Sequence, residues 1–152
     1  MINWQSLTYN DLTKDNLYDL AYERIRTFVQ EQNRPYQEID AVDKRATHIL
    51  GYQAGRLVAY ARVFMDGDHA TFGRVLTVAE VRGQGVGRQL MTQITAELAR
   101  HFAGQRVVIE AQVDKQHFYE KFKYATEGEP FIFNHTPHIR MVRQDDAQSV
   151  AS

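Results

Sequence analysis

The chain has 152 residues, of which 43% are hydrophobic and 24% charged, and its formal net charge at pH 7 is -1. This size and composition are typical of one globular domain, and the balanced charge gives no indication of a nucleic-acid or membrane partner. The absence of cysteine excludes disulfide bonds, thiolate metal sites and a cysteine nucleophile.

The first third of the chain predicts a strand, a helix and an acidic loop. Residues 2–7 have the character of a short strand, and Thr13 can cap a helix whose apolar residues recur at helical spacing to about Gln32. Pro35 ends this helix, because proline disfavours the helical conformation of the residue before it. A polar loop follows over residues 36–46 and contains three carboxylates, Glu38, Asp40 and Asp43.

The middle of the chain predicts an antiparallel meander of three strands. Two short turns, Ala54-Gly55 and Asp66-Gly67-Asp68, contain the glycine that tight hairpins favour. The strands that these turns join are residues 47–53, 56–65 and 69–78.

The last third predicts two helices and three strands. A helix from about Gly85 to Phe102 ends at Gly104. It connects the third meander strand to a buried strand by a crossover, so we expect a central parallel strand pair in a mixed, mostly antiparallel sheet flanked by helices. The elements after the crossover helix are a strand over residues 106–113, a helix over 115–122 and strands over 131–133 and 138–143.

These elements predict a single α/β (α+β) domain over residues 1–144, followed by a short flexible tail over residues 145–152. The first residues contain no basic segment followed by an apolar one, and no apolar run is long enough to span a membrane. We therefore expect a cytoplasmic protein. The last strands could also pair with a second copy of the chain, which would give a homodimer.

Three glycines at alternate positions, Gly83, Gly85 and Gly87, precede the long helix. A helix N-terminus presents unpaired N–H groups and partial positive charge, and glycines let an anion approach them, so this stretch predicts a phosphate-binding loop. It is not a P-loop, because neither Lys-Ser nor Lys-Thr occurs in the chain. It also differs from a dinucleotide-binding fingerprint, which needs a third glycine where Arg88 stands.

A third ligand class, coenzyme A, is indicated by a resemblance. Residues 82–87, Arg-Gly-Gln-Gly-Val-Gly, match the R/Q-x-x-G-x-G/A signature of the GCN5-related N-acetyltransferase (GNAT) superfamily. Leu76-Thr77-Val78 resembles the strand that binds the pantetheine arm in that family, and residues 118–122 resemble its F-Y-x-x-x-G-F element. Gln112 stands where many members have an asparagine near the cofactor.

A narrower resemblance, to the ElaA-like branch of the superfamily, rests on short segments in the right order, among them residues 28–32, 35–36, 59–62 and 137–139. The chain departs from the family pattern at three places. Lys123 replaces the glycine of the F-Y-x-x-x-G-F element, although lysine disfavours the left-handed conformation of such a turn. The other departures are Asn33-Arg34, in place of the cysteine common before Pro-Tyr, and Asn134-His135-Thr136, in place of an acidic loop.

The resemblance implies an N-acetyltransferase that transfers an acetyl group from acetyl-CoA to a primary amine by direct attack in a ternary complex. It places acetyl-CoA between the third meander strand and the strand over residues 106–113, where the Val78 N–H would polarise the acetyl carbonyl. The cofactor-binding residues that it implies are Leu76, Thr77, Val78, Arg82, Gly83, Gln84, Gly85, Val86, Gly87, Arg88, Gln112, Gln116 and Tyr119.

The same resemblance makes Tyr119 the candidate general acid for the departing thiolate, because a phenol has a reference pKa of about 10, above that of a thiol. Without the resemblance, Tyr119 is equally a packed aromatic side chain on an amphipathic helix. The general base stays open among a solvent chain and four side chains, of which we select Glu110 for the catalytic pair; the others are His48, Asp40 and Asp43.

The acidic loop suggests an acceptor. Glu38, Asp40 and Asp43, together with Arg74, are the candidate substrate-binding residues, and the carboxylates would attract a cationic amine such as a polyamine, a lysine or a peptide N-terminus. The alternative is that these carboxylates are solvated or cap a helix, and that Arg74 forms an ordinary strand ion pair.

Two functions of other classes stay open. One is a non-catalytic acyl-CoA-binding sensor on the same fold, and the other is a phosphate- or nucleotide-binding module of an unrelated fold. His135 and His138 lie three residues apart, but neither a cysteine nor a nearby carboxylate completes a ligand set, so we expect no metal site.

Overall fold

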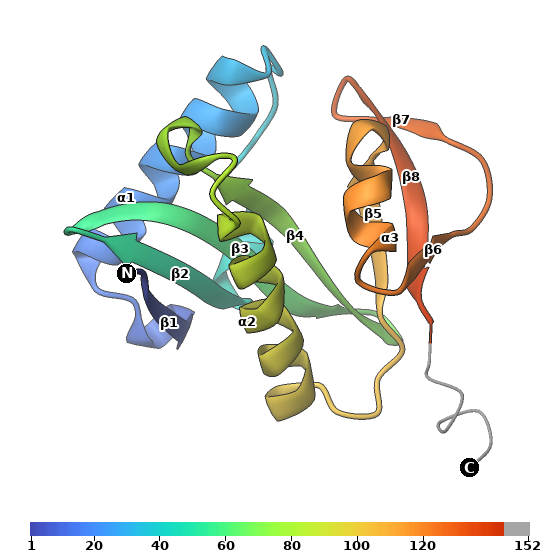
Figure 1. Cartoon of the computed structure of the whole chain (residues 1–152), viewed down its shortest axis with the longest axis horizontal. Coiled ribbons are helices and arrows are strands. Elements are labelled where there is room, and N and C mark those ends of the chain that lie inside the picture. The colour runs from blue at the N-terminus through green and yellow to red at the C-terminus, as the bar shows by residue number, and fades with distance from the viewer. Residues whose placement is uncertain (145–152) are drawn as a thin grey trace.

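The computed structural model describes residues 1–144 (Figure 1), and the predicted tail over residues 145–152 lies outside this part of the chain. Two sheets form the molecule. The first has the order β1-β2-β3-β4, and its strands are β1 (Asn3–Thr8), β2 (Thr47–Gln53), β3 (Arg56–Asp66) and β4 (His69–Thr77). In the second, β8 (Thr136–Arg143) pairs with β5 (Val108–Gln112), β6 (Tyr124–Thr126) and β7 (Phe131–Phe133).

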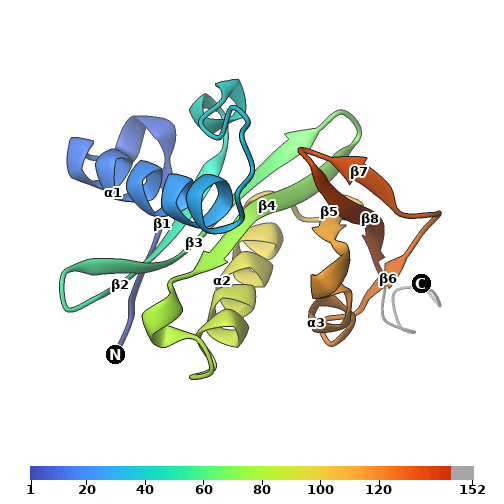
Figure 2. The same cartoon turned by 90° about the horizontal axis from the view of Figure 1, so that it is seen from above.

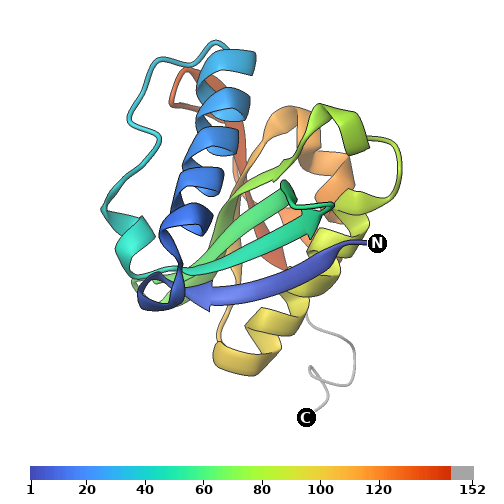
Figure 3. The ribbon, with the colours of Figure 1, turned by 90° about the vertical axis from the view of Figure 1, so that its left-hand side faces the viewer.

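The first sheet is covered by a helix on each face. The helix α1 (Lys14–Arg24) begins at a capping box, in which the Thr13 hydroxyl and the Asn16 side chain each accept from the other's backbone N–H. The helix α2 (Val86–His101) lies on the opposite face (Figures 2 and 3). Since both faces are covered, β3 is a nearly continuous apolar run that is buried over most of its length.

The predicted elements are confirmed for both long helices, for the meander and for the last two strands, within a few residues. The helical run that starts at α1 continues as a π-helical segment, Ile25–Glu31. The third helix, α3 (Gln116–Glu120), is shorter than predicted. The elements that were missed are the short strand β6 and three 3₁₀ turns, at Ala79–Val81, at Val113–Lys115 and at Ala41–Lys44, the last of which Asp40 caps inside the acidic loop.

The predicted parallel strand pair is wrong as an extended ladder. β4 and β5 meet at one isolated parallel bridge between Ala70 and Val107, where the Ala70 N–H donates to the Arg106 carbonyl at 2.8 Å. Beyond this bridge the two strands diverge (Figure 1), and every strand pair within the two sheets is antiparallel. The crossover is therefore present, but the strands that it connects belong to different sheets.

A bulge in β4 accounts for the divergence. The register of β3 against β4 shifts between Tyr60 and Arg62, so Arg74 and Val75 both lie opposite one residue of β3. Arg74 has a φ of +51°, which a residue with a side chain rarely adopts. Such a bulge bends its strand and increases the local twist, and here it turns β4 away from β5.

The turn after α3 keeps the left-handed residue of the family element even though a lysine occupies it. Lys123 has a φ of +72°, and its N–H donates to the Glu120 carbonyl at 3.2 Å. The Gln144 N–H donates to the Lys123 carbonyl at 2.7 Å, which holds the turn against the end of β8. Tertiary contacts have therefore overridden the local preference of this residue.

Within residues 1–144, no helix is long and apolar enough to cross a membrane.

Candidate functional site

A cleft of about 840 Å³ opens where β4 and β5 diverge. This volume lies in the range of ligand and cofactor pockets, about 300–1,000 Å³. The predicted site residues that line the cleft are Arg74, Leu76, Thr77, Arg82, Gly83, Gly85, Val86, Gly87, Arg88, Glu110, Gln112 and Tyr119. Those that do not line it are Val78, Gln84, Gln116, Glu38, Asp40 and Asp43.

The glycine loop, residues 82–87, brings bare backbone to the cleft at the start of α2. Gly83 and Gly85 have φ values of +82° and +78°, which favour glycine, and an added Cβ would meet no atom within 4 Å at either position. Gly85 is the N-cap of α2, and no side chain caps the helix. The first N–H groups of this 16-residue helix are therefore open to an anion from the cleft.

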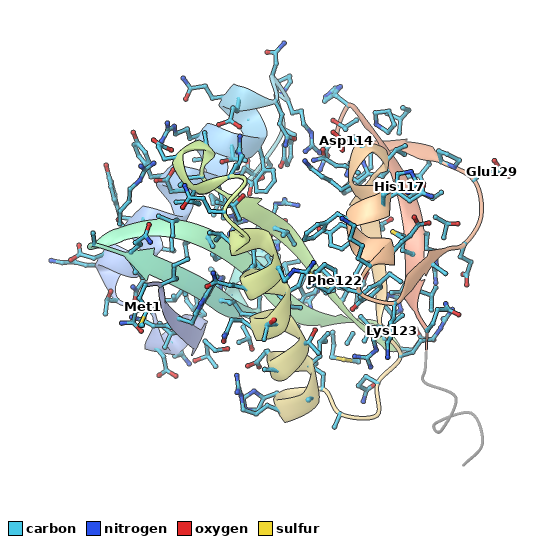
Figure 4. The ribbon with its side chains drawn as sticks, viewed as in Figure 1. Met1, Asp114, His117, Phe122, Lys123 and Glu129 are labelled. Atoms are coloured by element: carbon cyan, nitrogen blue, oxygen red, sulfur yellow. The ribbon has the colours of Figure 1, made fainter. Side chains whose placement is uncertain are left out.

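Basic side chains line the same cleft as the glycine loop. Arg88 lines the cleft and lies over the Phe122 ring, 5.9 Å from its centroid. Figure 4 places Phe122 between α2 and α3, so the pair spans the gap between the two helices. Lys115 and Lys121 also line the cleft, and we did not predict them. Their position at the start and near the end of the predicted helix over residues 115–122 was the available signal, since a positive side chain on a helix beside an anion loop is a candidate ligand.

Arg82 has a different role from Arg88. Its Nε donates to the Thr77 carbonyl at 3.0 Å, and its Nη2 lies 2.9 Å from a Glu31 carboxylate oxygen. The side chain thereby ties the end of β4 to the π-helical segment, and it fixes the loop that carries the glycines.

The Val78 N–H does not face the cleft, which corrects our assignment of this group as the donor to a carbonyl. It donates to the Val58 carbonyl of β3 at 3.0 Å. Successive N–H groups of a strand point to opposite edges, so the N–H of Thr77 points away from β3. Since Thr77 lines the cleft, its N–H is the better candidate for that donor.

The predicted glutamines have separate places. Gln112 donates from Nε2 to the Gln32 Oε1 at 3.0 Å, and this bond joins the two walls of the cleft. Gln84 donates to the Glu80 carbonyl at 3.3 Å, and Gln116 donates to a Glu120 carboxylate oxygen at 3.2 Å. Of the three, Gln112 alone is brought to the cleft.

Tyr119 is a buried side chain of α3 that reaches the cleft wall. Its ring contacts those of Phe72, Phe118 and Tyr124, and no residue among 1–144 accepts or donates a hydrogen bond at its hydroxyl. Burial raises the pKa of the phenol well above its usual value, and the neighbouring Tyr124 adds to the shift. The hydroxyl is therefore protonated at neutral pH and retains its proton for donation.

The acidic loop is held in a buried ion-pair network. Three carboxylates meet three arginines from separate elements: Glu38, Asp40 and Asp43 against Arg24 of α1, Arg62 of β3 and Arg74 of the β4 bulge. Glu38 lies 2.8 Å from Arg24 Nε and 2.9 Å from Arg74 Nε. Asp43 lies 2.6 Å from Arg24 and 3.0 Å from Arg62. The charges of the three carboxylates are thus matched one for one.

The arginines keep Asp40 and Asp43 ionised. Burial by itself would raise the pKa of Asp43, but Arg24, the Asp40 N–H and Arg62 together outweigh it and lower the pKa below its usual value. The pKa of Asp40 is lowered in the same way, because Arg62 and Arg74 together outweigh the effect of burial. A carboxylate with a lowered pKa is a weaker base, so neither residue is well suited to accept a proton from an amine.

The remaining predicted bases differ in access. His48 is fully buried, accepts from the Tyr60 hydroxyl at its Nδ1 over 2.5 Å and donates from Nε2 to the Asp43 carbonyl over 2.9 Å, so both its nitrogens are engaged. Burial lowers the pKa of His48, which makes it neutral at pH 7. Glu110 is exposed on β5 and lines the cleft.

His138 is a cleft residue that we considered only as a metal ligand. It is buried between the rings of Phe131 and Phe133, and its Nδ1 lies 2.8 Å from the Thr136 carbonyl oxygen. Because a carbonyl only accepts, Nδ1 carries the proton and Nε2 keeps its lone pair. Burial lowers the pKa of His138, and the charge of Arg34 adds to the effect. No group in the described part of the chain could complete a metal site around it.

Comparison with known proteins agrees with this geometry. A family model described as an acetyltransferase (GNAT) domain matches residues 16–144. The chain is 38% identical over 149 residues to the protein ElaA of Escherichia coli, covering 95% of this chain and 97% of that protein.

The fold also matches that of solved structures. The crystal structure of Escherichia coli ElaA superposes with a TM-score of 0.89 and covers 95% of this chain and 100% of that one. The crystal structure of an acyl-CoA N-acyltransferase from Pseudomonas aeruginosa superposes with a TM-score of 0.90 at 32% identity, with the same shares of the two chains covered.

Proposed function

Because the chain belongs to the acetyltransferase (GNAT) family, we propose that it transfers an acetyl group from acetyl-CoA to a primary amine by direct attack in a ternary complex. One observation carries the proposal: the cleft between β4 and β5 has an uncapped helix N-terminus and bare glycine backbone at one side and a buried phenol at another. This is the arrangement that a thioester with a pyrophosphate group needs.

The glycine loop would bind the phosphates of the cofactor. The first N–H groups of α2 are aimed at an anion, and Arg88, Lys115 and Lys121 add positive charge around it. The Thr77 N–H is our candidate for polarising the acetyl carbonyl, because developing negative charge on its oxygen is stabilised by a fixed donor.

A thermal melt tests the cofactor first. A ligand at 100 times its dissociation constant adds about 2.7 kcal/mol to the free energy of unfolding, which for a chain of this length raises Tm by about 5–10 °C. We expect this rise with acetyl-CoA and none with ATP or NAD. A rise with ATP or NAD instead would favour a nucleotide-binding module and refute the proposal.

Tyr119 would donate a proton to the departing thiolate. Tyr119→Phe removes the hydroxyl and leaves the ring contacts. We therefore expect kcat to fall by about 10²-fold or more, while the rise in Tm with acetyl-CoA stays the same. Tyr124→Phe is the matched control, because this buried ring lies 6.4 Å from Tyr119 and does not line the cleft. Equal losses in both variants would contradict the assignment.

His138 would accept the proton that the amine loses. Its lone pair at Nε2 and its lowered pKa make it a base at neutral pH, whereas Glu110 is exposed and Asp40 and Asp43 are ion-paired. Activity should fall as pH drops through the pKa of His138, because protonation removes the acceptor. We expect His138→Gln to lower kcat by about 10²-fold and to remove this acidic limb, while His117→Gln on the exposed face of α3 leaves both unchanged.

The remaining alternative is a sensor that binds acyl-CoA without turnover. The expected rise in Tm with acetyl-CoA, together with no release of CoA thiol in the presence of any primary amine, would favour this alternative.

A further inference from the structure

Arg34 is a buried cation on the cleft wall whose charge no carboxylate matches. It is only 5% exposed, and it follows the π-helical segment in the loop that leads to Tyr36. Figure 2 shows α1 and β7 on the side of the two sheets away from α2 and α3. Arg34 joins the segments on this side, since it bonds to the turn between β7 and β8.

The partners of Arg34 are all neutral. Its Nε donates to the Asn134 carbonyl at 3.0 Å, and its Nη1 donates to Gln32 Oε1, also at 3.0 Å. Its guanidinium carbon lies 4.9 Å from the centroid of the Tyr36 ring. No carboxylate among residues 1–144 forms an ion pair with it, and its Nη2 has no hydrogen-bond partner there. Burial of an uncompensated charge is costly, so such a group is normally paired with an anion.

The neighbouring carboxylates are already used. Glu38, Asp40 and Asp43 are matched by Arg24, Arg62 and Arg74, as described above, and Glu31 pairs with Arg82 at 2.9 Å. Asp66 also lines the cleft, but its side chain is 65% exposed at the hairpin turn beside His69. The wall of the cleft around Arg34 therefore offers positive charge. This charge does not suit the cationic amines that the acidic loop suggested.

A negative group remains on the opposite wall of the cleft. Glu110 lines the cleft on β5, and both Glu110 and Arg34 act electrostatically on His138. An acceptor held here would thus meet a carboxylate near the base and a guanidinium beside it. This pattern of charges is complementary to a molecule that carries an ammonium group and an acid group.

We propose that the acceptor is an amine that also carries a carboxylate, and that Arg34 binds this carboxylate through its unused N–H groups. This inference rests on the proposed acetyl transfer and names the class of its substrate. Arg34 is one of the positions where the sequence departs from the ElaA-like pattern, which commonly has cysteine before Pro-Tyr.

Matched acceptors test the proposal. Each pair has the same primary amine with either a carboxylate or a carboxamide: glycine and glycinamide, and 4-aminobutyrate and 4-aminobutyramide; putrescine serves as a cationic amine. Release of CoA thiol gives kcat/KM for each. We expect the carboxylate member to exceed the amide by about tenfold or more, because a hydrogen bond to a charged group contributes about 1.5–3 kcal/mol.

Variants assign the preference to Arg34. Arg34→Gln should lower kcat/KM for the carboxylate member by about 10- to 100-fold and leave the amide nearly unchanged, while Arg34→Lys keeps part of the preference. Arg106→Gln is the control, since this exposed arginine pairs with Glu127 outside the cleft. Equal use of the two members by the wild type, or equal losses for both in Arg34→Gln, would overturn the proposal.

A binding measurement separates this proposal from acetyl transfer itself. The Tm of the wild type and of Arg34→Gln is measured with each acceptor in the presence of CoA. Selective stabilisation by the carboxylate members that Arg34→Gln abolishes, without thiol release, would support carboxylate recognition and refute transfer. If transfer occurs and shows no preference for a carboxylate, the substrate class is wrong and the proposed function stands.

Discussion

Asp43 offers a direct test of whether the acidic loop attracts substrate or holds the fold together. Its carboxylate is 4% exposed and accepts from Arg24 at 2.6 and 3.2 Å, from Arg62 at 3.0 Å and from the Asp40 N–H at 3.0 Å. Asp43→Asn keeps the shape and one acceptor oxygen but removes the charge. Asp43→Ala removes all four bonds.

The expected loss of stability follows from the buried arginine that loses one of its partners. Arg24 is fully buried, and without Asp43 it keeps only the ion pair with Glu38. Removing one partner of a buried ion pair typically destabilises a protein by about 3–5 kcal/mol. We therefore expect Asp43→Asn to lower the free energy of unfolding by about 3 kcal/mol and Asp43→Ala by about 5 kcal/mol. For a chain of this length, a loss of 3 kcal/mol lowers Tm by about 6–12 °C.

Urea unfolding and thermal melts measure the loss, and Asp68→Asn is the matched control, because its side chain is 93% exposed and its pairing with His69 should contribute little. The reasoning would be refuted by an Asp43→Asn protein as stable as the wild type that has lost activity toward cationic amines alone. In that case the charge of Asp43 would serve the substrate and not the network.

Three further results are expected. Lys123→Gly should be more stable than Lys123→Ala by about 0.5–1 kcal/mol, because both variants lose the lysine side chain and only glycine relieves the positive φ, at the cost of greater freedom in the unfolded chain; equal stability of the two variants would contradict this. Stability should fall as pH drops from 7 to 5, because the pKa of buried His48 is lowered in the folded protein and the unfolded chain therefore binds more protons than the folded one. The effect is about 1.4 kcal/mol for each unit by which the two pKa values differ. The same dependence of stability on pH in His48→Gln would contradict this reasoning. Gly85→Ala should lower the free energy of unfolding by about 1 kcal/mol because of its positive φ, and it should reduce the rise in Tm that acetyl-CoA produces. Gly73→Ala is the control: this glycine has an ordinary φ and open space around it, so the stability without ligand should be unchanged.

Local signals in the sequence predicted most of the elements. The capping box at Thr13, the two glycine turns of the meander and the apolar spacing of α2 all act between residues close in the chain, and each element was found within a few residues of its predicted bounds. The glycine loop is also a local signal, since its glycines and the start of the helix lie next to each other in the chain. Its position on the cleft could therefore be expected without the tertiary structure.

The sequence by itself determined the α+β fold, the order of most of its elements, the glycine loop at the start of α2 and the place of Tyr119 on the last helix. Only the tertiary structure decided that β4 and β5 separate after one bridge, that the Val78 N–H serves the sheet, and that Glu38, Asp40 and Asp43 are neutralised by three arginines. It also left Arg34 unmatched. The physical reason is that the partner of a charge or of a backbone N–H lies far along the chain, at a distance that periodicity and turn residues do not encode.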